Sequence, residues 1–178
     1  MKIEDFEGTQ PKFTLEEYFE GKTTAWGLFE DRFGNVQRQF VVDITGTMDG
    51  DTLILREDFI YDDGEKETRE WRLTQTAEGR YEGITDNVIG TAEGQIVGNA
   101  FHWTYGFNLK VGESYWKVKF DDWMFMQPNG VLLNKAKVSR WGFTLGTVFI
   151  SFSKPVEQAA VQTATPSDAP VLSLAASR

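Results

Sequence analysis

The sequence predicts an all-β fold, a closed antiparallel up-and-down barrel of about eight to ten strands with one short N-terminal helix. Apolar and polar residues alternate over many segments, and glycine-containing turn dipeptides separate these segments. Between Lys12 and Lys154 the only proline is Pro128, and central strands exclude proline. No long amphipathic helix is available to cover an open sheet, so the sheet hides its edges most simply by closing on itself. A two-sheet sandwich is the alternative architecture.

The first expected element is a short helix over residues 14–20. Thr14 and Glu17 have the spacing of a capping box, and Gly21 is a natural helix end. Three apolar side chains lie on one face of this helix: Leu15, Tyr18 and Phe19. We expect about two turns, placed to plug one end of the barrel.

The remaining segments alternate with the period of a β-strand, most clearly where Phe101, Trp103 and Tyr105 share a face opposite His102. The expected strands span roughly residues 23–30, 36–48, 52–61, 66–76, 80–86, 91–97, 100–109, 114–122, 131–138 and 143–153. They are connected by dipeptides that tolerate positive φ: Asp49-Gly50, Asp63-Gly64 and Asn129-Gly130. Because these connections are short, sequence neighbours should pair antiparallel.

The chain is expected to hold one folded domain. Its 178 residues are close to the usual size of a single domain, and a hydrophobic fraction of 40% is enough for a core. We assign residues 1–12 to an N-terminal extension and residues 13–154 to the barrel domain. Residues 155–178 are rich in Ala, Pro, Ser and Thr and contain no aromatic side chain, so we expect a disordered tail.

Composition excludes several classes of site. The chain has no Cys and a single His, His102, which excludes disulfides, thiolate nucleophiles and metal sites rich in Cys or His. The net charge of -9 works against binding nucleic acid and against adsorption to an anionic membrane. We therefore expect no metal, no cofactor and no nucleic-acid partner.

The N-terminus is acidic and lacks an apolar leader, and no apolar stretch is long enough for a membrane span. The sequence as written is expected to stay in the cytoplasm. Association with a membrane, or a periplasmic lipoprotein whose leader has been trimmed, are the alternatives.

Asp122 is the most unusual candidate residue. It continues the alternating run of Trp116, Val118 and Phe120, which turns its carboxylate toward the interior. A buried carboxylate is costly unless it is hydrogen-bonded or paired, and burial raises its pKa toward neutrality. Asp122 is therefore either a structural acceptor of N–H groups at a strand bend, or a polar contact for a ligand or a proton-transfer group.

Asp58 and Arg72 lie on consecutive strands joined by the turn at residues 63–64. A cross-strand ion pair is one interpretation. In the other, Arg72 anchors the carboxylate of a fatty acid through its planar guanidinium. Asn134 is a further polar candidate.

Large aromatic side chains are abundant enough to form the interior of a barrel. They either fill it, as in small barrels, or line an apolar cavity with a few polar groups. On the second interpretation the ligand-binding residues comprise Trp26, Arg72, Trp103, Tyr105, Trp116, Phe120, Asp122, Trp123 and Asn134. His102 alternates with Trp103 and should face outward.

Several segments stand in an order and spacing that indicate a family. They are residues 45–50 (TGTMDG), 57–64 (EDFIYDDG), 69–73 (REWRL), 86–92 (DNVIGTA), 121–126 (DDWMFM), 134–136 (NKA) and 141–143 (WGF). From about Phe13 to Lys154 the sequence resembles DUF3833, a bacterial family of predicted lipoproteins. It lacks the Gly-x-Trp order of true lipocalins, since residues 25–27 read Ala-Trp-Gly, so we expect a lipocalin-like barrel only.

The resemblance implies an association with lipid chemistry and supplies no catalytic motif. Members of the family are often encoded near enzymes that modify fatty acyl chains, such as cyclopropane-fatty-acid-synthase-like methyltransferases, and many carry an N-terminal lipoprotein signal. This sequence departs from the pattern there, because it has neither a lipobox cysteine nor an apolar leader.

Two classes of function follow as hypotheses. In the first, the barrel binds a hydrophobic ligand, a fatty acid or a modified acyl lipid, and supports fatty-acyl or membrane-lipid modification. In the second, it is a cofactor-free isomerase, hydratase or cyclase on acyl chains, with Asp122, Asp58, Tyr61 and Tyr105 as candidate catalytic residues. A variant of the second makes it an accessory subunit of a lipid-modifying methyltransferase, which would be its protein partner.

Overall fold

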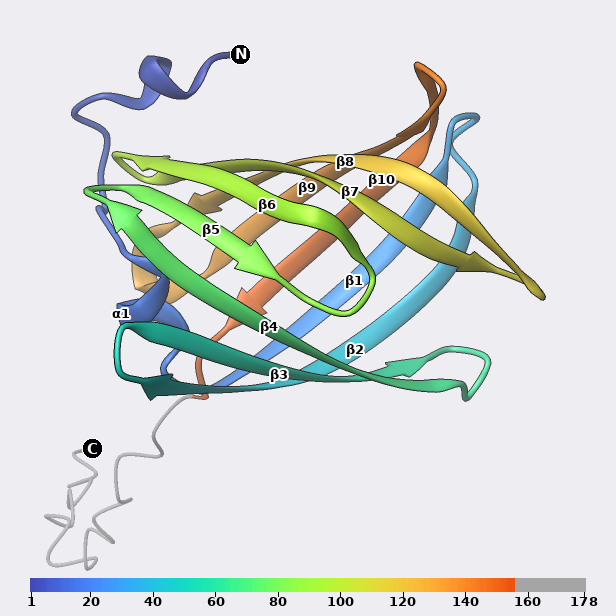
Figure 1. The fold of residues 1–178 in the computed structure, drawn as a ribbon, viewed down its shortest axis with the longest axis horizontal. Coiled ribbons are helices and arrows are strands. Elements are labelled where there is room, and N and C mark those ends of the chain that lie inside the picture. The colour runs from blue at the N-terminus through green and yellow to red at the C-terminus, as the bar shows by residue number, and fades with distance from the viewer. Residues whose placement is uncertain (156–178) are drawn as a thin grey trace, which may run out of the picture.

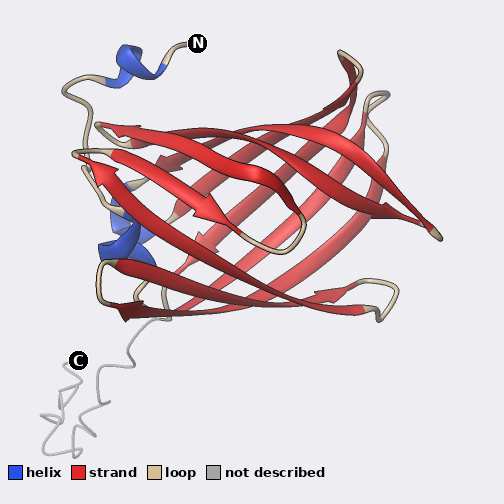
Figure 2. Ribbon diagram, viewed as in Figure 1, coloured by secondary structure: helices blue, strands red, loops and turns tan. Residues whose placement is uncertain are grey.

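Ten antiparallel strands close into a barrel in the computed structural model, which describes residues 1–155 (Figures 1 and 2). Each strand pairs with its sequence neighbours, and pairing of the first strand with the last closes the sheet. The strands are β1 (Gly21–Asp31), β2 (Val36–Asp49), β3 (Thr52–Tyr61), β4 (Lys66–Ala77), β5 (Arg80–Ile84), β6 (Val88–Val97), β7 (Ala100–Val111), β8 (Ser114–Met126), β9 (Leu132–Arg140) and β10 (Phe143–Ser153). The predicted up-and-down barrel is confirmed, and the sandwich is excluded. The predicted disordered tail lies, apart from Pro155, outside the described residues.

Of the ten strands, β6 and β8 extend furthest beyond the bounds that the alternation predicts. β6 begins at Val88, and its register against β7 shifts between Ile89 and Glu93, where Gly90 takes a φ of 77°. This irregularity interrupts the two-residue period, so the pattern conceals where the strand starts. β8 runs on to Met126, past the acidic pair at which we expected it to end.

The helix α1 (Leu15–Phe19) plugs one end of the barrel, as predicted. Thr14 caps it by accepting a hydrogen bond from the backbone N–H of Glu17, and its three apolar side chains are buried in the core. The Tyr18 hydroxyl donates to the carbonyl of Gly130 at 2.9 Å, which ties the helix to the short 3-10 turn η2 (Pro128–Gly130). A Cβ at Gly46 would lie 1.9 Å from the carbonyl oxygen of Phe19, so β2 needs glycine where the helix ends.

The N-terminal extension folds onto the outside of the barrel. Its 3-10 helix η1 (Ile3–Phe6) places Ile3 against Ala100 and Trp123. The ring of Phe6 lies 6.0 Å from that of Trp123 and 5.5 Å from that of Phe125. Trp123 is therefore buried on the outer wall, beneath η1, and not in the barrel interior.

The two ends of the barrel differ (Figure 1). We call the end covered by α1 the plugged end. The turns at residues 32–35, 62–65, 112–113 and 141–142 form the opposite end, which we call the open end, whereas the turn at residues 85–87 stops short of it because β5 is short. Near the plugged end the interior is filled by fully buried side chains: Leu15, Ile44, Leu53, Phe101 and Leu132.

Candidate functional site

A cavity of about 340 Å³ occupies the barrel interior between the packed core and the open end. It reaches Lys110 and Val111, which directly precede the turn between β7 and β8. Most of its wall is aromatic or aliphatic, and the aromatic lining comprises Phe29, Phe40, Phe59, Tyr61, Trp71, Trp103, Tyr105, Phe107, Phe120 and Phe152. Period-two alternation puts these side chains inside, because each lies on the inward face of its strand.

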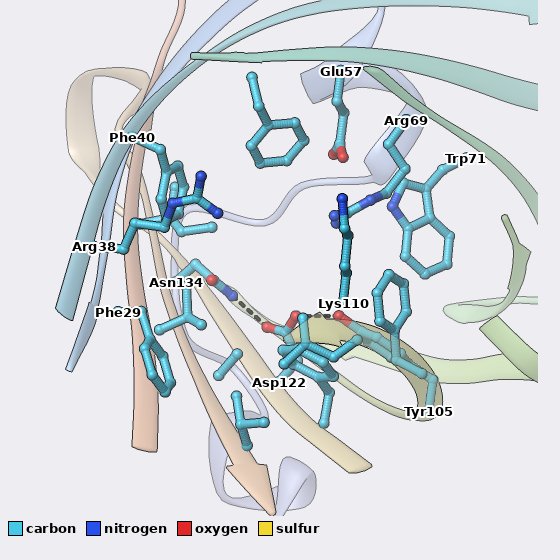
Figure 3. A pocket seen from close by; sticks show the side chains of 18 of the residues that line it. Phe29, Arg38, Phe40, Glu57, Arg69, Trp71, Tyr105, Lys110, Asp122 and Asn134 are labelled. Atoms are coloured by element: carbon cyan, nitrogen blue, oxygen red, sulfur yellow. Dashed lines mark hydrogen bonds between the residues drawn. The ribbon is translucent and has the colours of Figure 1, made fainter. Parts of the chain in front are cut away.

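Asp122 lies on the cavity wall, where the alternation of β8 predicted it (Figure 3). The side-chain amide of Asn134, on β9, donates to Asp122 Oδ1 and to the carbonyl of Trp123 at 3.1 Å. The Tyr105 hydroxyl, on β7, donates to Asp122 Oδ2 at 3.5 Å. Asp122 and Asn134 are buried, so three strands converge on one carboxylate.

The pKa of Asp122 is raised by burial to about 6. Hydrogen bonds from Asn134 and Tyr105 and the nearby indole of Trp103 oppose the shift, because they favour the charged carboxylate. The Trp103 indole N–H approaches the carboxylate without completing a hydrogen bond of good geometry. Asp122 can therefore take up or release a proton near neutral pH.

A second polar group lies on β3 and β4, where Glu57 and Arg69 are directly opposite in the register. Figure 3 shows the carboxylate of Glu57 and the guanidinium of Arg69 directed toward one another. Arg69 is held by Glu67, with Nη2 and Oε1 2.8 Å apart, and the Tyr61 hydroxyl donates to the other Glu67 oxygen at 2.9 Å. The guanidinium also lies over the ring of Phe59, at 4.9 Å from its centre. These contacts fix Arg69 in an otherwise apolar wall.

The pKa of Glu57 is raised to about 7, mainly by burial; the charge of Arg69 acts to lower it, and the smaller effects of the charges of Glu67 and Asp122 act with burial. Protein surrounds the carboxyl group, yet part of its surface borders the cavity and stays open to water. Burial acts to lower the pKa of Arg69, but Glu57 and Glu67 more than offset this, so its pKa is raised and it remains charged.

Arg38 of β2 lines the same cavity near the open end. Its guanidinium lies 3.4 Å from the centre of the Tyr61 ring and bonds to Asp63 and Glu65 of the β3–β4 turn, at 3.0 and 2.6 Å. The Nε atoms of Arg38 and Arg69 are buried and have no hydrogen-bond partner among the described residues. Three cationic side chains thus line the cavity, Arg38, Arg69 and Lys110, and the buried Nε of each arginine is an unused donor.

Several predicted site residues do line this cavity. They are Tyr61, Trp103, Tyr105, Phe120, Asp122 and Asn134. Trp116 is on the inward face of β8 but does not border the cavity, and the guanidinium of Arg140 covers its ring at 4.5 Å. His102 faces outward, as predicted, and its Nε2 lies 2.9 Å from Asp121.

Four other candidates, Arg72, Asp58, Trp26 and Trp123, lie on the outer face and do not line the cavity, so the expectation that Arg72, Trp26 and Trp123 bind a ligand there is wrong. Arg72 is exposed and pairs with Glu70, because Trp71 beside it faces inward. Asp58 binds Arg56 and Thr68, so the predicted pair with Arg72 does not form.

Trp26 and Trp123 are the other two. Trp26 is half exposed, because its neighbours Ala25 and Gly27 occupy the inward positions of β1. Trp123 stacks on His102 with ring centres 4.0 Å apart, and its indole N–H donates to Asp121.

Sequence reasoning missed Arg38, Glu57, Glu67 and Arg69. A signal was available, since Glu57 keeps the phase of Phe59 on β3, and Glu67 and Arg69 keep that of Trp71 on β4. Charged residues in such phase are normally taken to mark the outer face, because charges are seldom buried unpaired. Here the mutual pairing of Arg69 and Glu67 makes the inward placement tolerable.

Two general features bear on what this site contains. Within residues 1–155, no group of three or more His, Cys, Asp or Glu side chains is arranged to hold a metal ion. The helices of this same part of the chain lack the length and apolar character of a membrane-spanning helix.

Comparison with known proteins gives a family. No curated protein matches the chain. A model of the family described as "protein of unknown function (DUF3833)" matches residues 1–154, which include η1, α1 and all ten strands. The resemblance inferred from Phe13 to Lys154 is thereby confirmed and extended to the N-terminus. The chain belongs to the DUF3833 family.

Proposed function

We propose that the barrel binds a hydrophobic ligand with one polar end, a fatty acid or a modified acyl lipid, and so supports fatty-acyl or membrane-lipid modification. The observation that carries this proposal is the cavity of about 340 Å³, apolar over most of its wall and charged on one side. Its volume falls within the roughly 300–1,000 Å³ of small-molecule sites. A barrel that required only a core would fill this space with side chains, as the plugged half does.

Arg69 is the proposed contact for the polar end of the ligand. Glu67 engages one terminal nitrogen of its guanidinium, which leaves Nε as an unused donor. A planar guanidinium binds a carboxylate through two parallel hydrogen bonds, so an acyl carboxylate supplies the acceptor that this donor lacks. Glu57, whose pKa burial raises to about 7, is protonated in part at neutral pH and donates a further hydrogen bond.

The acyl chain is proposed to lie along the aromatic wall, toward Phe107, Phe120 and Val138. Each buried methylene contributes about 0.8 kcal/mol, so affinity should rise with chain length until the cavity is full and then level off. This dependence separates a cavity of fixed length from nonspecific adsorption, for which affinity keeps rising.

Isothermal titration of delipidated protein with saturated fatty acids of increasing length, and with the matching fatty alcohols, tests the proposal. The acids should bind more tightly than the alcohols. Arg69→Gln should weaken binding of the acids by about tenfold or more. Arg72→Gln is the matched control, because Arg72 lies on the outer face of the same strand and should leave affinity unchanged.

Absence of binding by every acid and alcohol, or equal losses in the two variants, would contradict the proposal. Thermal melting of each variant shows whether it is folded. If Arg69→Gln fails to fold, Arg69→Lys keeps the charge but removes the planar fork and should weaken binding of the acids specifically.

A second candidate function, proton-transfer catalysis on acyl chains, rests on Asp122. This carboxylate borders the cavity, has its pKa raised by burial to about 6 and receives a hydrogen bond from Tyr105. A group that titrates near neutral pH can serve as a general acid or base in an isomerisation, hydration or cyclisation.

Mass spectrometry of acyl lipids before and after incubation with the protein tests this second function. A changed lipid that is lost in Asp122→Asn, and kept in Asp121→Asn, would support it. Asp121 is the adjacent carboxylate but points outward to His102, so it controls for the loss of one charge. Unchanged lipids with the wild-type protein would leave only the binding function.

A further inference from the structure

Exposed aromatic side chains gather at the open end of the barrel. Phe33 and Trp141 are 74% and 82% exposed, and Phe143 and Tyr115 are also largely exposed. We call these four residues the aromatic rim. They lie in or beside the turns that connect β1 to β2, β7 to β8 and β9 to β10, all at the same end (Figure 1).

The rest of the described chain does not share this feature. Besides the rim, only two aromatic side chains of residues 1–155 are strongly exposed, Trp26 and Phe149, and both lie midway along the wall. The plugged end exposes no aromatic side chain among the described residues. The aromatic rim is thus a property of the end at which the cavity opens.

Trp141 also occupies a backbone position that disfavours it. It is the first residue of a two-residue turn in which Trp141 and Gly142 have φ angles of 52° and 83°. Such turns prefer Asn or Asp followed by Gly, and a bulky side chain at positive φ is strained. Because this side chain is almost fully exposed, burial in the core does not offset the strain. Local rules of this kind are broken mainly at functional positions.

Two arginine side chains lie over rings of the aromatic rim. The guanidinium of Arg140 lies 4.1 Å from the centre of the Trp141 ring, and that of Arg32 lies 4.6 Å from the centre of the Phe33 ring. Neither arginine forms an ion pair within residues 1–155. The nearby carboxylate of Asp31 already accepts hydrogen bonds from the backbone N–H groups of Phe33 and Asn35 and from the side-chain amide of Gln37.

Another part of the open end is acidic. The β3–β4 turn carries Asp62, Asp63 and Glu65 and no aromatic side chain, and Asp63 and Glu65 pair with Arg38. The open end therefore has an aromatic and cationic part, the β1–β2 and β9–β10 turns, and an acidic part, the β3–β4 turn, while the β7–β8 turn carries Glu113 near the exposed Tyr115.

We propose that the aromatic rim docks the open end onto the headgroup region of a bilayer that contains anionic lipid. Aromatic rings and arginines are the side chains enriched where protein meets the lipid–water interface. The net charge of -9 does not prevent this, because charges beyond a Debye length of about 8 Å are screened and only the rim is in contact. Lys110 and Val111 border both the cavity and this end, so a docked barrel opens toward the lipid. Exchange of the ligand with the bilayer would rest on the proposed function, whereas the docking itself does not.

Flotation with vesicles of phosphatidylcholine, with and without about one-third phosphatidylglycerol, tests the docking. The wild-type protein should float with the mixed vesicles and less with phosphatidylcholine alone. The triple variant Phe33→Ser, Trp141→Asn, Phe143→Ser should lose at least about tenfold in partitioning. The matched control, Trp26→Ser with Phe149→Ser, removes exposed aromatic area from the wall and should float like the wild type.

Two further readouts keep the result unambiguous. Trp141→Asn alone should raise the melting temperature, because Asn suits the turn, while it weakens flotation. Titration of the triple variant with a soluble fatty acid, without vesicles, should match the wild type, so loss of docking and loss of ligand binding are told apart. The proposal would be overturned if the wild type does not float, or if the wall control loses as much flotation as the triple variant. It would also be overturned if the rim residues are needed to bind a protein but not to bind vesicles.

Discussion

The plugged and open halves of the barrel are built from the same strands but use their inward faces differently. Toward the plugged end the inward side chains are aliphatic or aromatic and fully buried, as Leu53 and Phe101 are. Toward the open end the same strands turn Glu57, Arg69 and Asp122 inward, around a cavity of about 340 Å³. The plugged half is therefore packed throughout, whereas the open half combines a smaller buried cluster of Phe107, Val118 and Val138 with the cavity.

Truncation of one aromatic side chain in each half tests most directly whether the two halves are packed differently. Phe101→Ala should lower the free energy of unfolding by about 3–5 kcal/mol, because Phe101 is 1% exposed and its loss leaves a void in a packed core. Phe120→Ala should cost only about 1–2 kcal/mol, since its ring already borders the cavity and water can fill the space. Urea unfolding followed by circular dichroism measures both. Equal costs would mean that the open half is as much a packed core as the plugged half.

The cavity carboxylates should make stability depend on pH. Burial raises the pKa of Glu57 to about 7 and that of Asp122 to about 6, so the folded chain keeps protons that the unfolded chain has released. The resulting stability is present below the unfolded pKa values and is lost as pH rises through about 6 to 7. The free energy of unfolding should therefore increase as pH is lowered from about 8 to about 5.

Glu57→Gln isolates one of these carboxylates. At about pH 8 it should stabilise the protein by roughly 1 kcal/mol, a value reduced for partial exposure to the cavity, and near pH 5 it should have little effect. Glu70→Gln is the control, since Glu70 is exposed on the outer face of β4 and pairs with Arg72. A pH profile that is unchanged in Glu57→Gln would show that Glu57 is solvated like a surface carboxylate.

Most of the fold could be predicted because alternation is a direct consequence of the pleat. The inward position of Asp122 followed from Phe120, two residues earlier, and the structure agrees. Trp123 could not also face inward, because adjacent residues of a strand point to opposite faces. The same alternation, continued from Trp71, places Arg72 on the outer face, where it pairs with Glu70. The prediction that Arg72 binds a ligand carboxylate rested on its guanidinium chemistry and not on this alternation.

Other features could not be predicted from local pattern. Trp26 faces outward because its neighbours Ala25 and Gly27 occupy the inward positions. The ring of Phe40 fills the space beside Gly27, where an added Cβ would lie only 2.4 Å from that ring. The large indole side chain of Trp26 suggested an inward position instead, since large aromatic side chains are usually buried. The docking of η1 over Trp123 likewise depends on contacts between segments far apart in the chain.

The attachment of the plug gives the smallest of the expected effects. The buried Tyr18 hydroxyl donates to the Gly130 carbonyl at 2.9 Å, and burial raises the pKa of Tyr18 to about 12. Tyr18→Phe should cost about 1 kcal/mol, because one hydrogen bond between α1 and η2 is lost while the packing is kept. Tyr115→Phe, at the open end, should cost nothing measurable, since Tyr115 is exposed and donates no side-chain hydrogen bond within the described chain. Both variants should bind fatty acid as the wild type does, because neither residue borders the cavity. A loss of affinity in Tyr18→Phe would show instead that the plug sets the depth of the cavity and that the two halves are coupled.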